Sequence, residues 1–190
     1  MMFLEYKFTT EDLIEGCRSG QRKSQEALYK LYSAKMLGVC MRYATDRMEA
    51  EDMLQNGFVK VFNKLGDFRA EGSFEGWMRR IMVHCSIEYY RKHHKMMQVV
   101  DIDTACVDAS VDPLAASNLG VQDLLAIISQ LPPGYKMVFN LYAIEGYSHK
   151  EIGETMGITE GASKSQLSRA RAILKEQILK MEGQRYENVG

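Results

Sequence analysis

The few prolines of this 190-residue chain all lie in its second half, and this constrains the fold more than any other feature. They are Pro113, Pro132 and Pro133, so no proline interrupts residues 1–95. Proline inside a helix removes a hydrogen bond and clashes with the preceding turn, so its absence leaves room for long helices. Over residues 1–95 apolar residues recur at helical spacing, and no segment alternates in the way of a strand. We therefore predict an all-α fold.

The charge pattern divides the chain into two blocks. Residues 96–123 contain five aspartates and neither lysine nor arginine, whereas the helical segments on either side are rich in basic residues. We predict that residues 96–123 form a flexible acidic linker between two small helical domains, residues 1–95 and 124–190. Domains of this size can each bury a core of their own.

Several classes of protein are disfavoured by the composition. The four cysteines form no C-x-x-C pair, which argues against a disulfide framework and indicates a reducing cytoplasm. The first residues carry acidic groups where a signal peptide would be basic. No apolar run approaches the roughly 18 residues that a bilayer crossing needs. We predict a cytoplasmic protein without membrane insertion.

Metal binding and enzymatic activity are also disfavoured. The nearest approach to a zinc site is the set His84, Cys85, His93 and His94. Adjacent residues point to different sides of a helix, and no second cluster completes four ligands. Nothing in the chain pairs a nucleophile with a base or forms a glycine loop for phosphate. We predict no metal, no cofactor and no enzymatic activity.

The first block contains a helix with two distinct faces. Asp46 can cap this helix together with Glu49, and Gly66 marks its predicted end. Its apolar face is formed by Met53, Phe58, Val61, Phe62 and Leu65. Other sides carry Asp52, Gln55, Asn56, Val59 and Lys60.

A loop and a longer helix follow. The loop reads DFRAEGS, and Ser73 can cap the helix FEGWMRRIMVHCSIEYYRKHHK, whose end is basic as suits a helix C-terminus. Two alternatives stay open here. The aromatic residues are either core or binding residues: Phe74, Trp77, Tyr89 and Tyr90. The basic residues are either a solvated face or a binding surface: Arg79, Arg80, Arg91 and Lys92.

The second block has the pattern of a helix-turn-helix. Ser148 and Glu151 form an S-x-x-E capping box before the short helix HKEIGETM, and Gly157 ends that helix. Ile158 fills the turn, and Thr159 can cap the next helix. Two helices joined by a turn of about three residues are the signature of this motif.

One face of the last helix is polar and basic although the chain has a net charge of -1. Apolar residues hold the opposite face against the domain: Leu167, Ala170, Leu174 and Ile178. The residues left for a partner are Ser163, Lys164, Ser165, Gln166, Arg169 and Arg171. In a major groove arginine pairs with guanine edges, and lysine or serine meets phosphate. A merely solvated basic helix is the alternative.

Two stretches of the sequence resemble one known family. EGYSHKEIGETMGITEGASKSQLSRARAILKE resembles the fourth conserved region of bacterial sigma factors of the extracytoplasmic-function (ECF) group. The stretch from EALYKLY to SIEYYRK resembles their second conserved region. The matches cover roughly residues 20–95 and 120–180, in the family's order. The resemblance implies a region 2 helical bundle and a region 4 helix-turn-helix. It also implies a subunit of RNA polymerase that recognises promoters and helps to open DNA.

The resemblance assigns roles to residues of the first domain. The segment EAEDMLQNGFVKVF matches the part of the family that docks on the polymerase's largest subunit, which gives contact candidates Asp52, Gln55, Asn56 and Val59. The loop FRAEGSF matches the segment that captures a flipped base of the minus-ten element's non-template strand. The implied minus-ten residues are Phe68, Arg69, Glu71, Ser73, Phe74, Trp77, Arg80, His84 and Arg91. Members often have an acidic residue at Asn56 and asparagine at His84.

The resemblance also assigns roles to the second domain and the linker. Lys164, Ser165, Arg169 and Arg171 match positions that meet the minus-thirty-five element, whereas Gln166 stands where the family is commonly basic. The acidic linker is expected to thread the polymerase cleft and mimic nucleic acid, or to be a solvated spacer. The implied partners are core RNA polymerase, promoter DNA and an anti-sigma factor. The alternatives are a helix-turn-helix regulator that does not dock on polymerase and a helical protein-binding adaptor.

Overall fold

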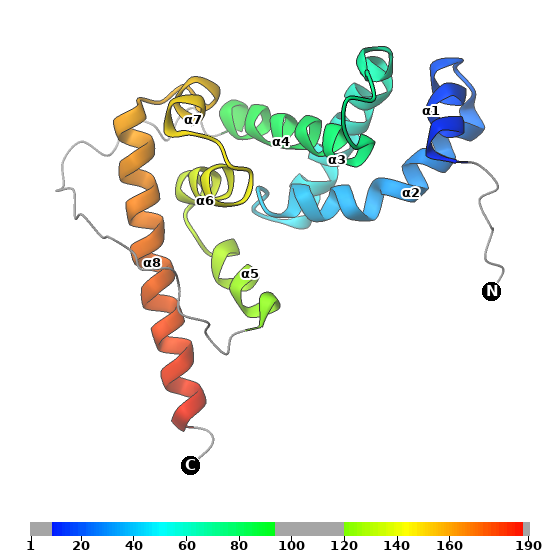
Figure 1. The fold of residues 1–190 in the computed structure, drawn as a ribbon. Helices are drawn as coiled ribbons and strands as arrows, with labels where there is room; N and C mark the ends of the chain where they lie inside the picture. Colours follow the sequence, from blue (N-terminus) through cyan, green and yellow to red (C-terminus); the bar gives the residue numbers. More distant parts are fainter. Residues whose placement is uncertain (1–8, 94–119, 188–190) are drawn as a thin grey trace. The chain divides into compact units, whose positions relative to one another are not determined.

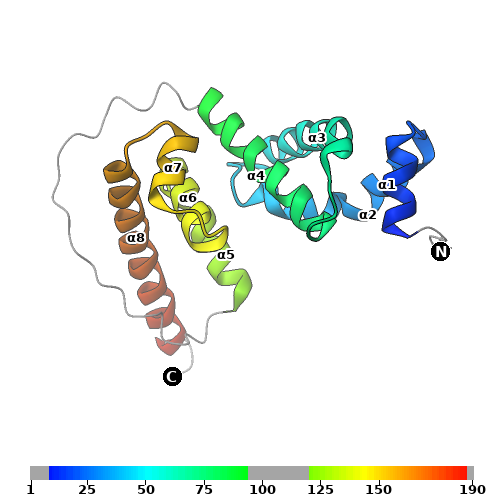
Figure 2. The same cartoon turned by 45° about the horizontal axis from the view of Figure 1, so that its top comes forward.

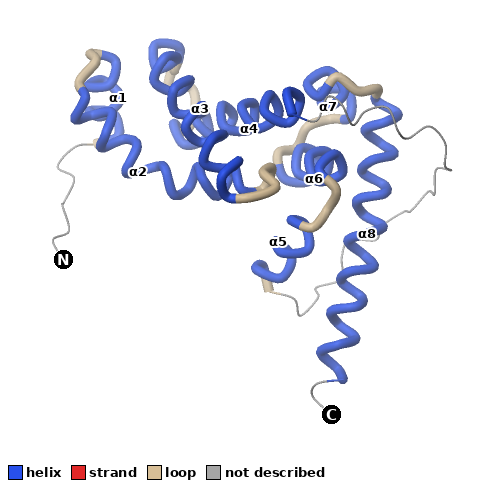
Figure 3. The backbone as a smooth tube through the Cα atoms, turned by 180° about the vertical axis from the view of Figure 1, so that it is seen from behind, coloured by secondary structure: helices blue, strands red, loops and turns tan. Residues whose placement is uncertain are grey.

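The computed structural model describes residues 9–93 and 120–187, and both ranges consist of helices with short connections (Figures 1 and 3). Neither range contains a strand, which confirms the predicted all-α fold. The chain divides into two compact units, with the boundary between Tyr89 and Tyr90. We call them the N-terminal unit and the C-terminal unit and describe each by itself. Residues 96–119 of the predicted linker lie outside the described residues.

In its described residues the N-terminal unit consists of three whole α-helices, all but the last turn of a fourth, and one short 3-10 turn. The helices are α1 (Thr10–Arg18), α2 (Arg22–Met41), α3 (Arg47–Lys64) and α4 (Phe74–His93), and the 3-10 turn spans Leu65–Asp67. Its core comes from the inner faces of these helices: Leu28, Met36, Met53, Val61, Met78, Met82 and Ile87 are almost fully buried. Lys35 on α2 forms an ion pair with Glu75 on α4 at 2.7 Å.

Local capping explains where these helices begin. The Asp46 carboxylate accepts a hydrogen bond from the Glu49 N–H at 2.9 Å, as predicted. The Glu49 carboxylate reaches back to the Thr45 N–H at 2.8 Å, one residue before the expected partner. Gly66 marks the end of α3 as predicted, because it directly follows the C-cap residue Leu65. The chain tightens there into the 3-10 turn, and the Phe68 N–H closes this turn on the Leu65 carbonyl at 3.3 Å.

The described cysteines Cys17, Cys40 and Cys85 are buried free thiols. Burial raises the pKa of Cys40 to about 12. The Cys40 thiol is therefore protonated at neutral pH and packs as a small apolar group.

The C-terminal unit packs three shorter helices along one long helix. They are α5 (Val121–Ser129), α6 (Pro133–Phe139), α7 (His149–Met156) and the long α8 (Glu160–Glu187), with a π-helical turn over Asn140–Ile144. Figures 1 and 2 show α5, α6 and α7 lying along α8. The core between α5 and α8 is formed by Ile127, Leu131, Ala170, Leu174 and Ile178. Three of these residues belong to the apolar face that the sequence predicted for the last helix.

The start of α5 differs from the sequence-based expectation. Composition placed residues up to Asp123 in the linker, but Val121–Asp123 form the first turn of α5. The Asp123 carboxylate accepts a hydrogen bond from the Gly120 N–H at 3.2 Å. An acidic residue is favourable at this end of a helix because the unpaired N–H groups there are electropositive. Asp123 therefore belongs to the helix start.

Candidate nucleic-acid interface

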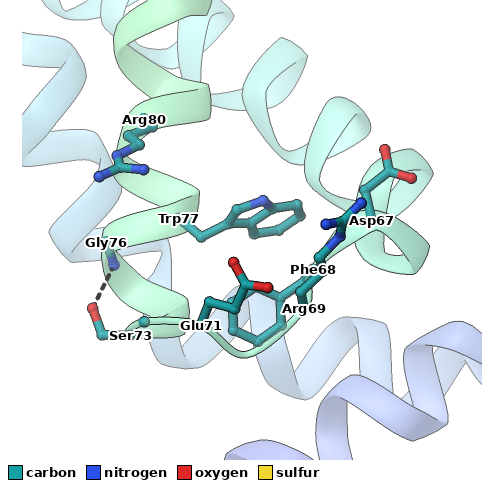
Figure 4. A pocket seen from close by; sticks show the side chains of 9 residues that line it. Asp67, Phe68, Arg69, Glu71, Ser73, Gly76, Trp77 and Arg80 are labelled. Atoms are coloured by element: carbon teal, nitrogen blue, oxygen red, sulfur yellow. Dashed lines mark hydrogen bonds between the residues drawn. The ribbon is translucent and has the colours of Figure 1, made fainter.

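A pocket of about 370 Å³ lies where the loop after α3 meets the first turns of α4 (Figure 4). Its volume falls within the range of small-ligand sites. The Ser73 hydroxyl caps α4 by accepting a hydrogen bond from the Gly76 N–H at 3.0 Å, which confirms the predicted cap. The lining residues are Asp67, Phe68, Arg69, Glu71, Gly72, Ser73, Gly76, Trp77 and Arg80.

Three aromatic rings support one side of this pocket. Phe74 and Trp77 are stacked, with centroids 5.6 Å apart and an interplanar angle of 23°. Phe68 lies 5.4 Å from Trp77 and 5.1 Å from Phe74. Phe74 is only 7% exposed, so its prediction as a DNA contact is wrong: it packs edge-on against Tyr32 in the core. Phe68 and Trp77 are half-buried and line the pocket, so Trp77 has both a packing contact and an accessible surface.

The polar side chains around the pocket are exposed and carry both signs of charge. Arg69, Glu71 and Arg80 all line it, so it offers a ligand both hydrogen-bond donors and acceptors. Ala70, at the tip of the loop, has a φ of +57°. A residue with a side chain rarely adopts this conformation, and such strain is concentrated at functional sites. His84 and Arg91 are exposed further along α4 and do not line the pocket.

The predicted docking residues share one exposed face of α3. Asp52, Gln55 and Asn56 are exposed, and Val59 is 59% exposed although it is apolar. Their spacing of three and four residues brings them together on the helix surface. Met48, four residues before Asp52, extends this face and is 75% exposed. Met48 is not among the sequence-predicted docking residues, although its position four residues before Asp52 could have indicated it.

A groove of about 310 Å³ adjoins this face between α2 and α3. It includes Gln55 among its lining residues, and the Arg47–Glu51 ion pair of 2.7 Å lies along it. The remaining lining residues are Tyr29, Ser33, Ala34, Leu37 and Leu54. A concave, partly apolar surface next to exposed Val59 and Met48 is typical of a protein-binding site.

In the C-terminal unit, α7 and α8 form the predicted helix-turn-helix. Ser148 and Glu151 make the full capping box, and the Thr159 hydroxyl accepts from the Ala162 N–H at 3.0 Å. Gly157 has a φ of +74°, the left-handed conformation that ends α7. The Gly153 carbonyl accepts hydrogen bonds from the N–H groups of Gly157 and Ile158 at 2.9 and 3.0 Å. A Cβ at Gly153 would lie 2.8 Å from the Ile158 carbonyl oxygen.

The predicted reading face of α8 contains one clear error. Ser163 is fully buried, and its hydroxyl is 2.9 Å from His149 Nδ1 on α7, so it is not available to DNA. It packs inward because it lies one turn before Leu167, on the face that meets α7. Lys164 is exposed and pairs with Glu160 at 2.7 Å. Ser165 and Gln166 are half-buried.

The two arginines of α8 are oriented by aromatic residues of the preceding helices. The Arg169 guanidinium donates a hydrogen bond to the Tyr135 hydroxyl at 3.2 Å. The Arg171 guanidinium lies 5.7 Å above the ring of Tyr142, a cation–π contact. The Tyr142 ring also stacks on His149, with ring centroids 4.6 Å apart. The sequence did not reveal these contacts because they join residues on different helices.

His149 is held in its neutral form by its surroundings. Burial and the nearby positive charges of Lys164 and Arg171 lower the pKa of its imidazole, and Glu160 opposes this only in part. Depending on its tautomer, the neutral imidazole either accepts a hydrogen bond from the Ser163 hydroxyl or donates one to the Ser163 oxygen. The residue therefore links the start of α7 to the first turn of α8.

Within residues 9–93 and 120–187, no three histidine, cysteine or acidic side chains are grouped so as to hold a metal ion. Over the same ranges, no helix combines the length and the hydropathy that crossing a bilayer requires.

A helix-turn-helix unit and a helical unit with a polar, aromatic-walled pocket define a two-unit helical DNA-binding protein. Comparisons with known families narrow this class. Residues 28–96 match the family described as Sigma-70 region 2, and residues 122–174 match the family described as Sigma-70, region 4. The chain therefore belongs to the sigma-70 family.

Two similar proteins are named as ECF sigma factors. The chain is 30% identical over 163 residues to the ECF RNA polymerase sigma factor SigE of Mycolicibacterium smegmatis, a match covering 83% of this chain and 62% of that protein. It is 26% identical over 184 residues to the ECF RNA polymerase sigma-E factor of Haemophilus influenzae, covering 90% and 96%. A solved structure of the sigma factor RpoE in complex with the anti-sigma factor NepR from Bartonella quintana aligns with a TM-score of 0.47 at 22% identity, over 82% and 96% of the two chains.

Proposed function

We propose that this chain is a sigma factor that binds core RNA polymerase, recognises promoter DNA and promotes strand opening at transcription initiation. The observation that carries the proposal is the presence, in one chain, of a pocket lined by polar and aromatic side chains at the start of α4 and a helix-turn-helix in the C-terminal unit. Such a protein supplies recognition and not chemistry, so it is not an enzyme. Its place of action is the cytoplasm.

Docking on polymerase is assigned to the exposed face of α3. Asp52, Gln55, Asn56 and Val59 provide one acidic, two amide and one apolar side chain on this face. This mixture suits an interface in which a charged contact steers association and an apolar contact is buried. Met48 is added to the face as a second apolar contact. The neutral side chain of Asn56 leaves Asp52 as the charged member of the four.

Capture of a flipped minus-ten base is assigned to the pocket beside Trp77. Arg69, Glu71 and Arg80 place donors and acceptors around it, and Trp77 supplies an aromatic surface. A base extruded from the duplex needs both, because it loses its stacking and its pairing at once. His84 and Arg91 are exposed further along α4 and are assigned to the phosphates of the same strand.

Reading of the minus-thirty-five element is assigned to α8. Lys164 is placed against phosphate, and Arg169 and Arg171 are placed toward the major groove, with Ser165 and Gln166 between them. The aromatic partners of both arginines restrict their rotamers, so less entropy is lost when they bind DNA. Ser163 is withdrawn from this set because it is buried.

An anti-sigma factor is a further expected partner, as the family membership implies. Docking residues on α3 are the surface that such an inhibitor would have to cover to prevent polymerase binding. The exposed apolar side chains Met48 and Val59 are suited to a second protein partner there.

The test is reconstitution with purified components. The full chain is mixed with core RNA polymerase and assayed for co-migration, then for transcription from a library of promoter sequences. We expect a stable complex and transcripts from a defined subset of promoters. Duplex DNA binding without co-migration would instead identify a helix-turn-helix regulator, and co-migration without promoter selection would identify an adaptor. Either result would contradict the proposed function.

A further inference from the structure

Arg18, the last residue of α1, binds the backbone at the entrance to the pocket-forming loop. Its Nε donates a hydrogen bond to the Leu65 carbonyl at 3.2 Å, and its Nη2 donates to the Phe68 carbonyl at 2.8 Å. Its Nη1 lies 3.7 Å from the Glu15 carboxylate, one turn earlier on α1. One guanidinium thus joins α1 to two points of the chain that lie far from it in sequence.

The two carbonyls bracket the 3-10 turn. Leu65 is its first residue, and Phe68 directly follows its last residue, Asp67. Phe68 is also the point at which the chain enters the loop that lines the pocket. A hydrogen bond from a charged donor is stronger than one between neutral groups, and the planar guanidinium donates in two fixed directions at once. The geometry therefore fixes both ends of the turn with one side chain.

The position of this turn sets the position of an aromatic wall of the pocket. Phe68 contacts the rings of Trp77 and Phe74, at 5.4 and 5.1 Å between centroids. Two residues later, Ala70 has the strained φ of +57°. A strained residue persists only where its surroundings hold it in place. Arg18 supplies such a constraint just before the strained residue, and the Ser73 cap supplies one just after it.

We propose that Arg18 is a positioning residue that holds the pocket in the shape that receives an unstacked base. The inference rests on the proposed function only in the identity of the ligand. Arg18 does not line the pocket and acts through the backbone of Leu65 and Phe68. It adds α1, a helix outside the region 2 match that begins at residue 28, to the elements that shape the DNA-binding surface.

The chain carries its own reporter for this inference. Trp77 is the only tryptophan of the sequence and lies in the pocket wall, so its fluorescence reports on pocket packing alone. The variants are Arg18→Met, which keeps the length but loses the donors, and Arg18→Lys, which keeps the charge but loses the planar fork. The matched control is Arg22→Met, an exposed arginine at the start of α2.

We expect Arg18→Met to shift Trp77 emission to longer wavelength and to increase acrylamide quenching. Arg18→Lys should show a smaller change of the same kind, because an ammonium group can still donate to one carbonyl. Arg22→Met should match the unchanged protein, and far-ultraviolet circular dichroism should be the same in all four. Unchanged Trp77 fluorescence in Arg18→Met would overturn the proposal. Loss of helical signal in both Arg18 variants would also overturn it, because Arg18 would then support the whole unit.

A second measurement separates the positioning role from the function. With each variant bound to core polymerase, affinity for a single-stranded minus-ten oligonucleotide should fall about tenfold in Arg18→Met, since only molecules with a correctly shaped pocket bind. Affinity for core polymerase should not change. If Trp77 fluorescence changes while oligonucleotide affinity does not, Arg18 positions the pocket as proposed, and the assignment of base capture to that pocket is refuted.

Discussion

Replacing Trp77 with alanine tests whether the ring at the pocket acts on DNA or only on the fold. The ring has two aromatic neighbours, Phe68 and Phe74, at 5.4 and 5.6 Å. Each pair contributes about 0.5–1.5 kcal/mol beyond area burial, so their loss should lower the free energy of unfolding by about 1–3 kcal/mol. A base stacked on the ring contributes about 1–3 kcal/mol more, but only in the DNA complex.

The two contributions are separated by measuring stability and DNA binding on the same variants. Urea unfolding followed by circular dichroism gives the first. Binding of a single-stranded minus-ten oligonucleotide to the reconstituted holoenzyme gives the second, and we expect a loss of about 5- to 150-fold. Trp77→Phe, which keeps an aromatic ring at the position, should recover most of the affinity. Affinity for upstream duplex DNA should be unchanged.

If oligonucleotide affinity and the rate of open-complex formation are both unchanged in a folded Trp77→Ala protein, Trp77 is a packing residue only. The melted strand would then take another path, and the assignment of Trp77 to the DNA would be refuted. Equal loss of affinity for the oligonucleotide and for upstream duplex would point to general unfolding and would refute the assignment in the same way.

Three further perturbations follow from the other surfaces. Asp52→Arg should weaken binding to core polymerase by about 2–5 kcal/mol. Glu11→Arg, which makes the same change of charge at an exposed position of α1, should leave that binding unchanged. If Asp52→Arg and the original chain gave the same binding curve with core polymerase, α3 would not belong to the interface. Lys164→Ala should weaken binding to all upstream sequences alike and reduce the magnitude of the slope of log affinity against log salt concentration by about one. A changed sequence preference in promoter selection would instead show that Lys164 contacts a base and not a phosphate. The pKa of His149 is lower in the folded protein than in the unfolded chain, so the unfolded chain protonates this imidazole more readily. The stability that neutral His149 contributes is therefore complete above about pH 6.5, and it is lost as the pH falls through the pKa of the folded state. Urea unfolding at several pH values should show this loss in the original chain and a smaller one in His149→Asn; identical pH profiles would refute the role of His149.

Features encoded within a few residues could be predicted from the sequence. The capping box of Ser148 and Glu151 and the glycine that ends α7 both came from patterns spanning one helical turn, and the structure confirms both. The same holds for the Ser73 cap at the start of α4. Patterns of this kind are reliable because the partners are fixed by the local backbone, whatever the rest of the fold does.

Features that depend on distant partners could not be predicted in the same way. Ser163 looks like a small polar residue on an accessible helix face, but it meets His149 from the other helix. Phe74 resembles Trp77 in sequence context, yet only Phe74 reaches the core. Arg18 binds carbonyls 47 and 50 residues away, and a carbonyl leaves no trace in the sequence because every residue has one.

The hydrogen bonds on the Gly153 carbonyl have a consequence for how promoter preference can change. They close the turn between α7 and α8, and the Ile158 carbonyl leaves no room for a side chain at Gly153. The turn between the two helices is therefore fixed by backbone atoms, which substitutions on the exposed face of α8 leave in place. Under the proposed function, a change in upstream sequence preference is therefore expected from exchange of exposed side chains along α8, and not from a change in the turn that joins α7 to α8.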